Sequence, residues 1–80
     1  MPILEVVVID ADTGRPVSFG VMVCVGDYCS PTGFDGTARL VVPKGTYTLT
    51  VGGGAYDIVR RTIIADRDKR IRVTVRRVLL

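Results

Sequence analysis

Two cysteines on either side of a Gly-Asp pair form the residue pattern with the most chemical potential in this chain. Cys24 and Cys29 flank Gly26-Asp27, a dipeptide typical of a two-residue β-hairpin turn. Such a turn places the two cysteines directly opposite each other, with Cα atoms about 4.5 Å apart, which suits a disulfide. The alternative is a pair of buried free thiols. A redox-active pair is not expected, because the spacing is not Cys-x-x-Cys.

Carboxylates are the other candidate ligands. Asp10, Asp12 and Gly14 have the spacing that begins a calcium-binding loop, but no downstream Glu completes it, so an Asp-capped turn is expected. The chain has no His, which excludes Ser-His-Asp and Cys-His catalysis and imidazole metal sites. The glycines at 52–54 precede a strand rather than a helix, which argues against a phosphate loop. We therefore expect no catalytic residue, no cofactor and no metal site.

Positive charge is concentrated towards the C-terminus. Residues 60–80 hold eight basic and two acidic side chains, whereas residues 1–59 hold three basic and six acidic ones. Arg70, Arg72 and Arg76 share the outward face of the last expected strand, where they would meet phosphates. This predicts nucleic-acid binding as an alternative function, although the aromatic side chains of a single-strand binder are missing there. The same charges would also discourage aggregation of an edge strand.

An apolar segment follows the basic residues. Val78, Leu79 and Leu80 come after Arg76-Arg77, and they either fold back over the sandwich or form an intermolecular contact. We favour the contact, most simply in a symmetric homodimer. No stretch is apolar for long enough to span a membrane as a helix, and residues 1–9 lack the pattern of a signal peptide. The compartment is left open: the cytoplasm or a virion if the chain is complete, the extracellular space if it is a mature fragment.

β-Strands must position these residues, because the hydrophobic period is two almost everywhere and no helical period occurs. Turn residues separate seven expected strands, at 3–9, 18–25, 28–29, 37–42, 46–51, 56–64 and 70–77. We expect Phe19 to alternate inward with the valines that follow it, and a register change near residues 60–61. The pattern predicts one all-β domain over residues 1–80, a seven-stranded antiparallel Ig-like or transthyretin-like β-sandwich with Greek-key connections and no helices.

The order of these turns and strands resembles the carboxypeptidase regulatory-like domains, within the wider transthyretin-like and Cna-B-like sandwiches. The segments that carry the resemblance are VIDADTGRPV at 8–17, TGFDGTARL at 32–40, VPKGTYTLTV at 42–51 and GAY at 54–56. The resemblance implies an accessory module that sits beside catalytic domains, forms stalks or mediates contacts. Cna-B-like domains often carry a Lys–Asn or Lys–Asp isopeptide bond. None is expected here, because Lys44 and Lys69 fall in turns and the last strand has no Asn or Asp.

Composition and resemblance together predict a non-enzymatic module for protein–protein interaction or structural assembly. The absence of Asn and Gln is typical of hyperthermophiles, so we expect a hyperthermophilic archaeon or a virus of one as the source. Nucleic-acid binding through the basic strand is one alternative. Carbohydrate binding is another, and it would need an exposed aromatic platform, for which Tyr28, Phe34 and Tyr56 are the candidates.

Overall fold

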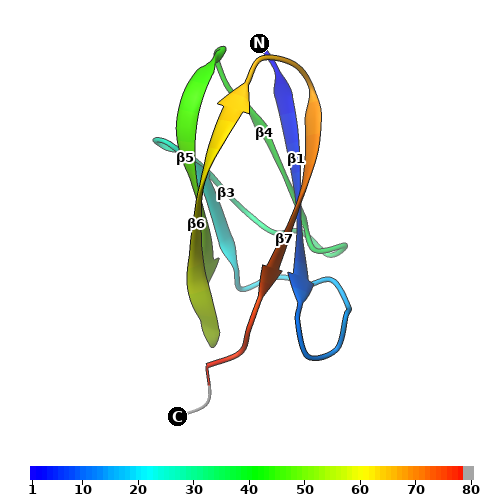
Figure 1. Cartoon of the computed structure of the whole chain (residues 1–80). Coiled ribbons are helices and arrows are strands. Elements are labelled where there is room, and N and C mark those ends of the chain that lie inside the picture. Colours follow the sequence, from blue (N-terminus) through cyan, green and yellow to red (C-terminus); the bar gives the residue numbers. More distant parts are fainter. Residues whose placement is uncertain (79–80) are drawn as a thin grey trace.

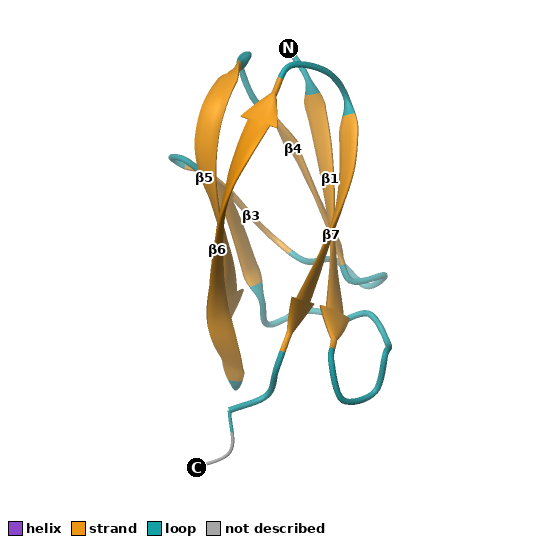
Figure 2. Ribbon diagram, in the orientation of Figure 1, coloured by secondary structure: helices purple, strands orange, loops and turns teal. Residues whose placement is uncertain are grey.

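Two β-sheets pack face to face in the computed structural model, which describes residues 1–78 (Figure 1). The seven strands, in chain order, are β1 Ile3–Asp10, β2 Met22–Val25, β3 Tyr28–Pro31, β4 Thr37–Val41, β5 Gly45–Gly53, β6 Tyr56–Ala65 and β7 Lys69–Val75. The described part of the chain contains strands, turns and loops but no helix (Figure 2), and hence no helix that could span a membrane. The predicted all-β sandwich of seven strands is confirmed.

The strands pair in the order β4-β1-β7 in one sheet and β3-β2-β5-β6 in the other. The chain changes sheet after β1, β3, β4 and β6, so β1 pairs with β4, and β2 with β5, across intervening strands, as the Greek-key expectation requires. Only the β2–β3 and β5–β6 connections are hairpins within a sheet. Each sheet is therefore assembled from segments far apart in the sequence.

One strand pair corrects the prediction of a wholly antiparallel sandwich. β7 runs parallel to β1 (Figure 1). Their register pairs Leu4 with Lys69 and Asp10 with Val75. The cause is the turn at residues 66–68, which carries the chain from β6 to the other sheet at the end where β1 begins. Asp68 Oδ1 accepts a hydrogen bond of 2.8 Å from the Ile3 backbone N–H and fixes this turn beside the start of β1. β7 and β1 therefore start together and run in the same direction.

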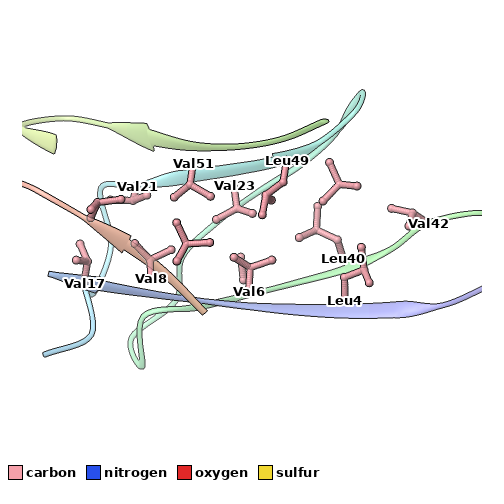
Figure 3. Packing of buried hydrophobic residues seen from close by; sticks show 14 of the residues in the cluster. Leu4, Val6, Val8, Val17, Val21, Val23, Leu40, Val42, Leu49 and Val51 are labelled. Carbon is pink, nitrogen blue, oxygen red and sulfur yellow. The ribbon is translucent and has the colours of Figure 1, made fainter. Parts of the chain in front are cut away.

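The core consists of inward-facing strand residues together with Val17, Val21 and Val42 from the connecting segments, and it is almost entirely aliphatic (Figure 3). Valine dominates it, because a β-branched side chain packs well on a pleated sheet. Each of these side chains stabilises the fold by roughly 1.5–3 kcal/mol when fully buried. The fully buried valines and leucines are Leu4, Val6, Val8, Val21, Val23, Val25, Val42, Leu49, Val51, Val73 and Val75.

Two local expectations are wrong, and backbone conformation explains both. β2 begins at Met22 rather than at residue 18, because Phe19 and Gly20 have φ values of +59° and +78°, which interrupt an extended strand. Phe19 is therefore exposed rather than inward. The register shift between β5 and β6 lies at Val51/Gly53 and not near residues 60–61. A Cβ on Gly52 would come within 2.9 Å of Ile58 Cγ1, so a glycine there permits the close approach of the two strands.

Candidate interaction surfaces

The hairpin of β2 and β3 is closed by a disulfide between Cys24 and Cys29, whose Cα atoms are 4.0 Å apart. Gly26 occupies the turn with a φ of +57°, a conformation that favours glycine. A Cβ at this position would also lie 2.9 Å from Cδ1 of Tyr47. The disulfide expectation is confirmed in place of free thiols. Because the closed loop is short, the bond contributes only about 2 kcal/mol by chain entropy.

The disulfide lies on the outer face of the four-stranded sheet, where hydroxyl, sulfur and aliphatic groups replace charge. Strand register places on this face, here named the threonine face, the residues Met22, Cys24, Cys29, Pro31, Thr46, Thr48, Thr50, Gly52, Ile58, Arg60, Thr62 and Ile64. Met22, Ile58 and Ile64 are 46%, 60% and 56% exposed. Met22 and Ile58 line a shallow depression of about 190 Å³ with Cys24 and Thr50. Of the charged side chains in residues 1–78, Arg60 alone belongs to this face.

The outer face of the three-stranded sheet is charged instead. In one row across the strands, Arg39 of β4 faces Glu5 of β1, and Glu5 faces Arg70 of β7. In the next outward row, Val7 of β1 lies beside Arg72 of β7. The arginines are exposed, while the β1 side chains between them are half-buried. We name the surface of Ile3, Glu5, Val7, Arg39, Arg70 and Arg72 the arginine face.

The structure places the predicted basic residues in two groups. Arg70 and Arg72 share the arginine face, but Arg76 lies beyond the end of β7. Its backbone N–H donates to Asp57 Oδ1, and its carbonyl accepts from the Asp57 N–H, both at 2.9 Å. Arg39 takes the third place on the arginine face, although the sequence did not single it out. Alternation through residues 37–42 implied that it points outward, but gave no sign that β4 lies beside β1.

Asp10 closes one end of the sandwich through three hydrogen bonds to its carboxylate. Its Oδ1 accepts hydrogen bonds from the backbone N–H groups of Asp12 (2.8 Å) and Thr13 (3.3 Å), and its Oδ2 accepts one from the Tyr56 hydroxyl (3.1 Å). The hydrogen bond from Asp12 is the largest cause of a lowered pKa of Asp10, with smaller contributions from Thr13, Tyr56 and the Arg77 charge. Asp10 therefore forms the expected capped turn, and residues 1–78 contain no cluster of metal-binding side chains.

The aromatic candidates for a carbohydrate platform, Tyr28, Phe34 and Tyr56, do not all lie together. Tyr28 lies opposite Val25, which pairs with Leu49, whereas Tyr56 pairs with Gly53, about 13 Å further along β5. Phe34 is 82% exposed and packs edge-on against Phe19, with ring centroids 6.2 Å apart. Tyr28 and Tyr56 thus lie apart, whereas Phe34 forms an exposed aromatic pair with Phe19, and carbohydrate binding stays a prediction.

The apolar segment predicted to form a contact is only partly described. Val78 is exposed, and its backbone N–H donates to the Ala55 carbonyl at 2.6 Å, which joins the end of the described chain to the β5–β6 turn. Leu79 and Leu80 lie outside the described residues. Their proposed role in a dimer contact stays a prediction.

Comparison with known proteins places this architecture among Ig-like and transthyretin-like sandwiches. The sequence profile of the archaeal fibronectin-III type-like domain matches residues 3–60. No curated protein sequence matches the chain.

Three solved structures share the fold at low identity. A type II cohesin–X–dockerin complex from Acetivibrio cellulolyticus matches with a TM-score of 0.67 and 18% identity, covering 94% of this chain and 57% of that chain. The Bacillus anthracis TIE protein gives 0.70 and 14%, covering 95% and 16%. A Klebsiella pneumoniae 5-hydroxyisourate hydrolase gives 0.67 and 16%, covering 96% and 91%. The chain thus spans little more than half of the first structure and a small part of the second, and these likenesses concern the fold alone.

Proposed function

Because this chain belongs to the archaeal fibronectin-III type-like domain family, we propose that it is a non-catalytic protein-interaction module that self-associates through its threonine face. An archaeal source accords with the family, and a composition without Asn or Gln accords with a hot habitat. The narrower likeness to carboxypeptidase regulatory-like domains remains a prediction within this fold. The interaction role is also in keeping with the cohesin–dockerin complex among the structural neighbours, which is itself a protein assembly.

The distribution of charge is the observation that carries this proposal. The chain has eleven basic and eight acidic side chains, and of all these only Arg60 lies on the threonine face. The cores of protein interfaces are depleted of charged residues in the same way. The exposed side chains of Met22, Ile58 and Ile64 supply apolar area that a partner would remove from water. A sheet face of this kind can pack against a second sheet at about 10 Å.

The size of the face predicts a weak dimer. Strand lengths and spacing give it about 400 Å² per copy, against about 800 Å² for a stable interface. We therefore expect dissociation in the micromolar range or above, rather than an obligate dimer. A two-fold axis between the central strands β2 and β5 would set β6 of one copy over β3 of the other. Arg60 on β6 then avoids its own symmetry mate, so its charge does not oppose the pairing.

Non-catalytic function is part of the proposal, although one structural neighbour is a hydrolase. With no His in the chain, acid–base chemistry would depend on carboxylates, amines and phenols. The Tyr56 hydroxyl donates a hydrogen bond to the Asp10 carboxylate, and this contact holds the end of the sandwich together. The residues that the fold brings together at this end thus support a structural role.

The oligomeric state tests the proposal. Light scattering after size exclusion, with protein loaded at about 10 to 500 µM, should give a mass that rises from 8.7 kDa towards twice that value. Ile58→Lys should remain monomeric, because it places a second positive charge on the threonine face beside Arg60. Val41→Lys is the matched control, since Val41 is 51% exposed in a strand of the other sheet.

Two outcomes would contradict self-association through this face. The first is a wild-type chain that stays at the monomer mass over the whole concentration range. The second is a loss of dimer in Val41→Lys equal to that in Ile58→Lys, with both variants folded by circular dichroism.

A further inference from the structure

The arginine face carries positive charge that the rest of the described chain does not neutralise at short range. Arg39 and Arg70 stand on either side of Glu5, and Arg72 follows beside Val7. Within residues 1–78, a single ion pair has its nitrogen and oxygen atoms closer than 4 Å. It joins Lys69 Nζ to Asp66 Oδ1 at 3.0 Å, beside the turn before β7. None of the three arginines therefore has a described carboxylate in salt-bridge contact.

These arginines also line a groove. Val7, Arg70 and Arg72 surround a depression of about 350 Å³. A second depression of about 230 Å³, lined by Ile3, Glu5, Arg39, Asp68, Lys69 and Arg70, adjoins it at Arg70. The Asp68 carboxylate in this lining accepts the hydrogen bond from the Ile3 backbone N–H and lies next to Lys69. Together the two depressions follow β1, whose half-buried side chains form the floor. Arg39 on β4 forms one wall and the β7 arginines form the other, about 10 Å away across two strand spacings.

We propose that this groove binds an extended, acidic segment of a partner protein. Arg70 and Arg72 are two residues apart on one strand, which spaces their side chains by about 6.6 Å. Alternate side chains of an extended peptide have the same spacing, so two carboxylates of the segment can each meet one guanidinium group. Such pairs form short, charge-assisted and often bidentate hydrogen bonds. The aliphatic parts of the segment would cover Val7 and Ile3, which remain partly exposed in the floor.

Glu5 makes the groove selective for a peptide over a nucleic acid. A carboxylate between Arg39 and Arg70 repels the evenly spaced phosphates of a polynucleotide. A peptide can place a neutral residue over Glu5 and its acids beside Arg70 and Arg72. No aromatic side chain on which a base could stack lines the two depressions of the groove, and Tyr28 shares only a separate depression with Arg39. Charge complementarity combined with an apolar floor therefore favours an acidic protein segment.

This inference is independent of self-association, because the groove and the threonine face lie on opposite outer surfaces of the sandwich. A dimer joined through the threonine faces would leave both grooves open. The module would then present two copies of the acidic-peptide site on one particle. A failure of dimerisation leaves the groove intact, and the two proposals can fail separately.

Fluorescence anisotropy provides the test. The probe is a fluorescein-labelled peptide that alternates Glu and Thr, and the control peptide has Gln in place of every Glu. The full chain should bind the first probe and not the second at low salt. The double variant Arg70→Gln/Arg72→Gln should bind at least about tenfold more weakly, because it removes two charge-assisted contacts. Arg15→Gln/Arg61→Gln loses the same charge from residues outside both the arginine face and the threonine face, and should change the affinity by less than about threefold.

A third variant tests the role of the floor. Glu5→Gln removes the carboxylate between Arg39 and Arg70 and should tighten binding of the acidic peptide by a few fold. Equal losses in the two arginine double variants would overturn the site and leave only general charge attraction. Absence of peptide binding at low salt would overturn it as well. Tighter binding of a thymidine oligonucleotide of equal charge would replace the peptide with a nucleic acid as the ligand.

Discussion

The two outer faces of this sandwich share the same strand geometry and present opposite chemistry. The three-stranded sheet turns outward Arg39, Arg70 and Arg72 around a groove, whereas the four-stranded sheet turns outward threonines and aliphatic side chains with a single charge at Arg60. The buried inward residues of the two sheets hardly differ, since in both they are valine, leucine and alanine, with isoleucine and tyrosine side chains partly buried beside them. The inward-facing strand residues therefore specify the fold, and the outward-facing residues give the two sheets different surfaces for binding.

The largest expected effect is a difference in stability between an inward and an outward substitution on strand β5. Leu49→Ala should destabilise the fold by about 2–5 kcal/mol, because it leaves a cavity in the core that both sheets share. Thr50→Ala, the next residue along β5 and part of the threonine face, should cost less than about 1 kcal/mol. Urea unfolding followed by circular dichroism measures both changes. Similar losses in the two variants would contradict the assignment of the two faces of β5.

The disulfide is expected to matter less than the core, although it joins two strands of the threonine face. Cys24→Ser/Cys29→Ser should lower the free energy of unfolding by about 2 kcal/mol, the entropy of one short closed loop. The comparison is with the parent chain under the same urea series, with and without reductant. If reductant lowers the free energy of unfolding of the parent chain to that of the double variant, loss of the disulfide is the cause of the difference. An effect of reductant on the double variant would point to another source.

Acid should weaken the end of the sandwich that Asp10 holds. The pKa of Asp10 is lowered in the folded chain, chiefly by the hydrogen bond from the Asp12 backbone N–H. A carboxyl with a lowered folded pKa contributes stability above its unfolded pKa and loses that stability as pH falls through the folded value. The Tm should therefore be level near neutrality and fall below about pH 4.

The pKa of Asp66 is also lowered, because its carboxyl has a hydrogen bond with Lys69 in an exposed turn.

Asp10→Asn should have a lower Tm at neutral pH and a shallower decline in acid than the parent. Thermal melts from pH 7 to about pH 2 provide the measurement. An unchanged acid slope in Asp10→Asn would show that other carboxyls govern the acid response.

Removal of residues 78–80 is expected to have the smallest effect. A chain ending at Arg77 loses the backbone hydrogen bond from Val78 to Ala55, which is worth about 1 kcal/mol. If the apolar segment adds to the dimer contact as the sequence predicts, the truncated chain should also dimerise a few fold more weakly. Light scattering and urea unfolding measure the two effects on one sample. Dimerisation that is unaffected by truncation would leave the threonine face as the sole contact and remove the segment from it.

Local chemistry predicted much of this fold, and pairing between distant strands accounts for most of what it missed. Gly26-Asp27 indicated the hairpin and its disulfide because a two-residue turn determines which residues lie opposite. Alternation likewise identified the inward valines. It could not give the direction of β7, because a strand with the same alternating pattern can pair in parallel or antiparallel.

The candidate surfaces were predictable only in part for the same reason. Arg70 and Arg72 follow from alternation within one strand, whereas Arg39 joins them only through the pairing of β4 with β1. Phe19 fitted an alternating pattern with Val21, but its positive φ places it outside the strand. The threonine face arises from four strands whose outward residues are individually unremarkable. Its lack of charge emerges only when the sheet order brings those residues together.

A dilution series followed by amide NMR tests most directly whether the threonine face self-associates while the arginine face binds the acidic segment. On concentration from about 10 to 500 µM, the account predicts shifts and broadening of amides on the threonine face, such as Thr50, Ile58 and Thr62. Amides of Arg39, Arg70 and Arg72 should stay in place until the acidic peptide is added, and should then move alone. Concentration-dependent shifts centred on the arginine face, or a spectrum that does not change on dilution, would contradict the account.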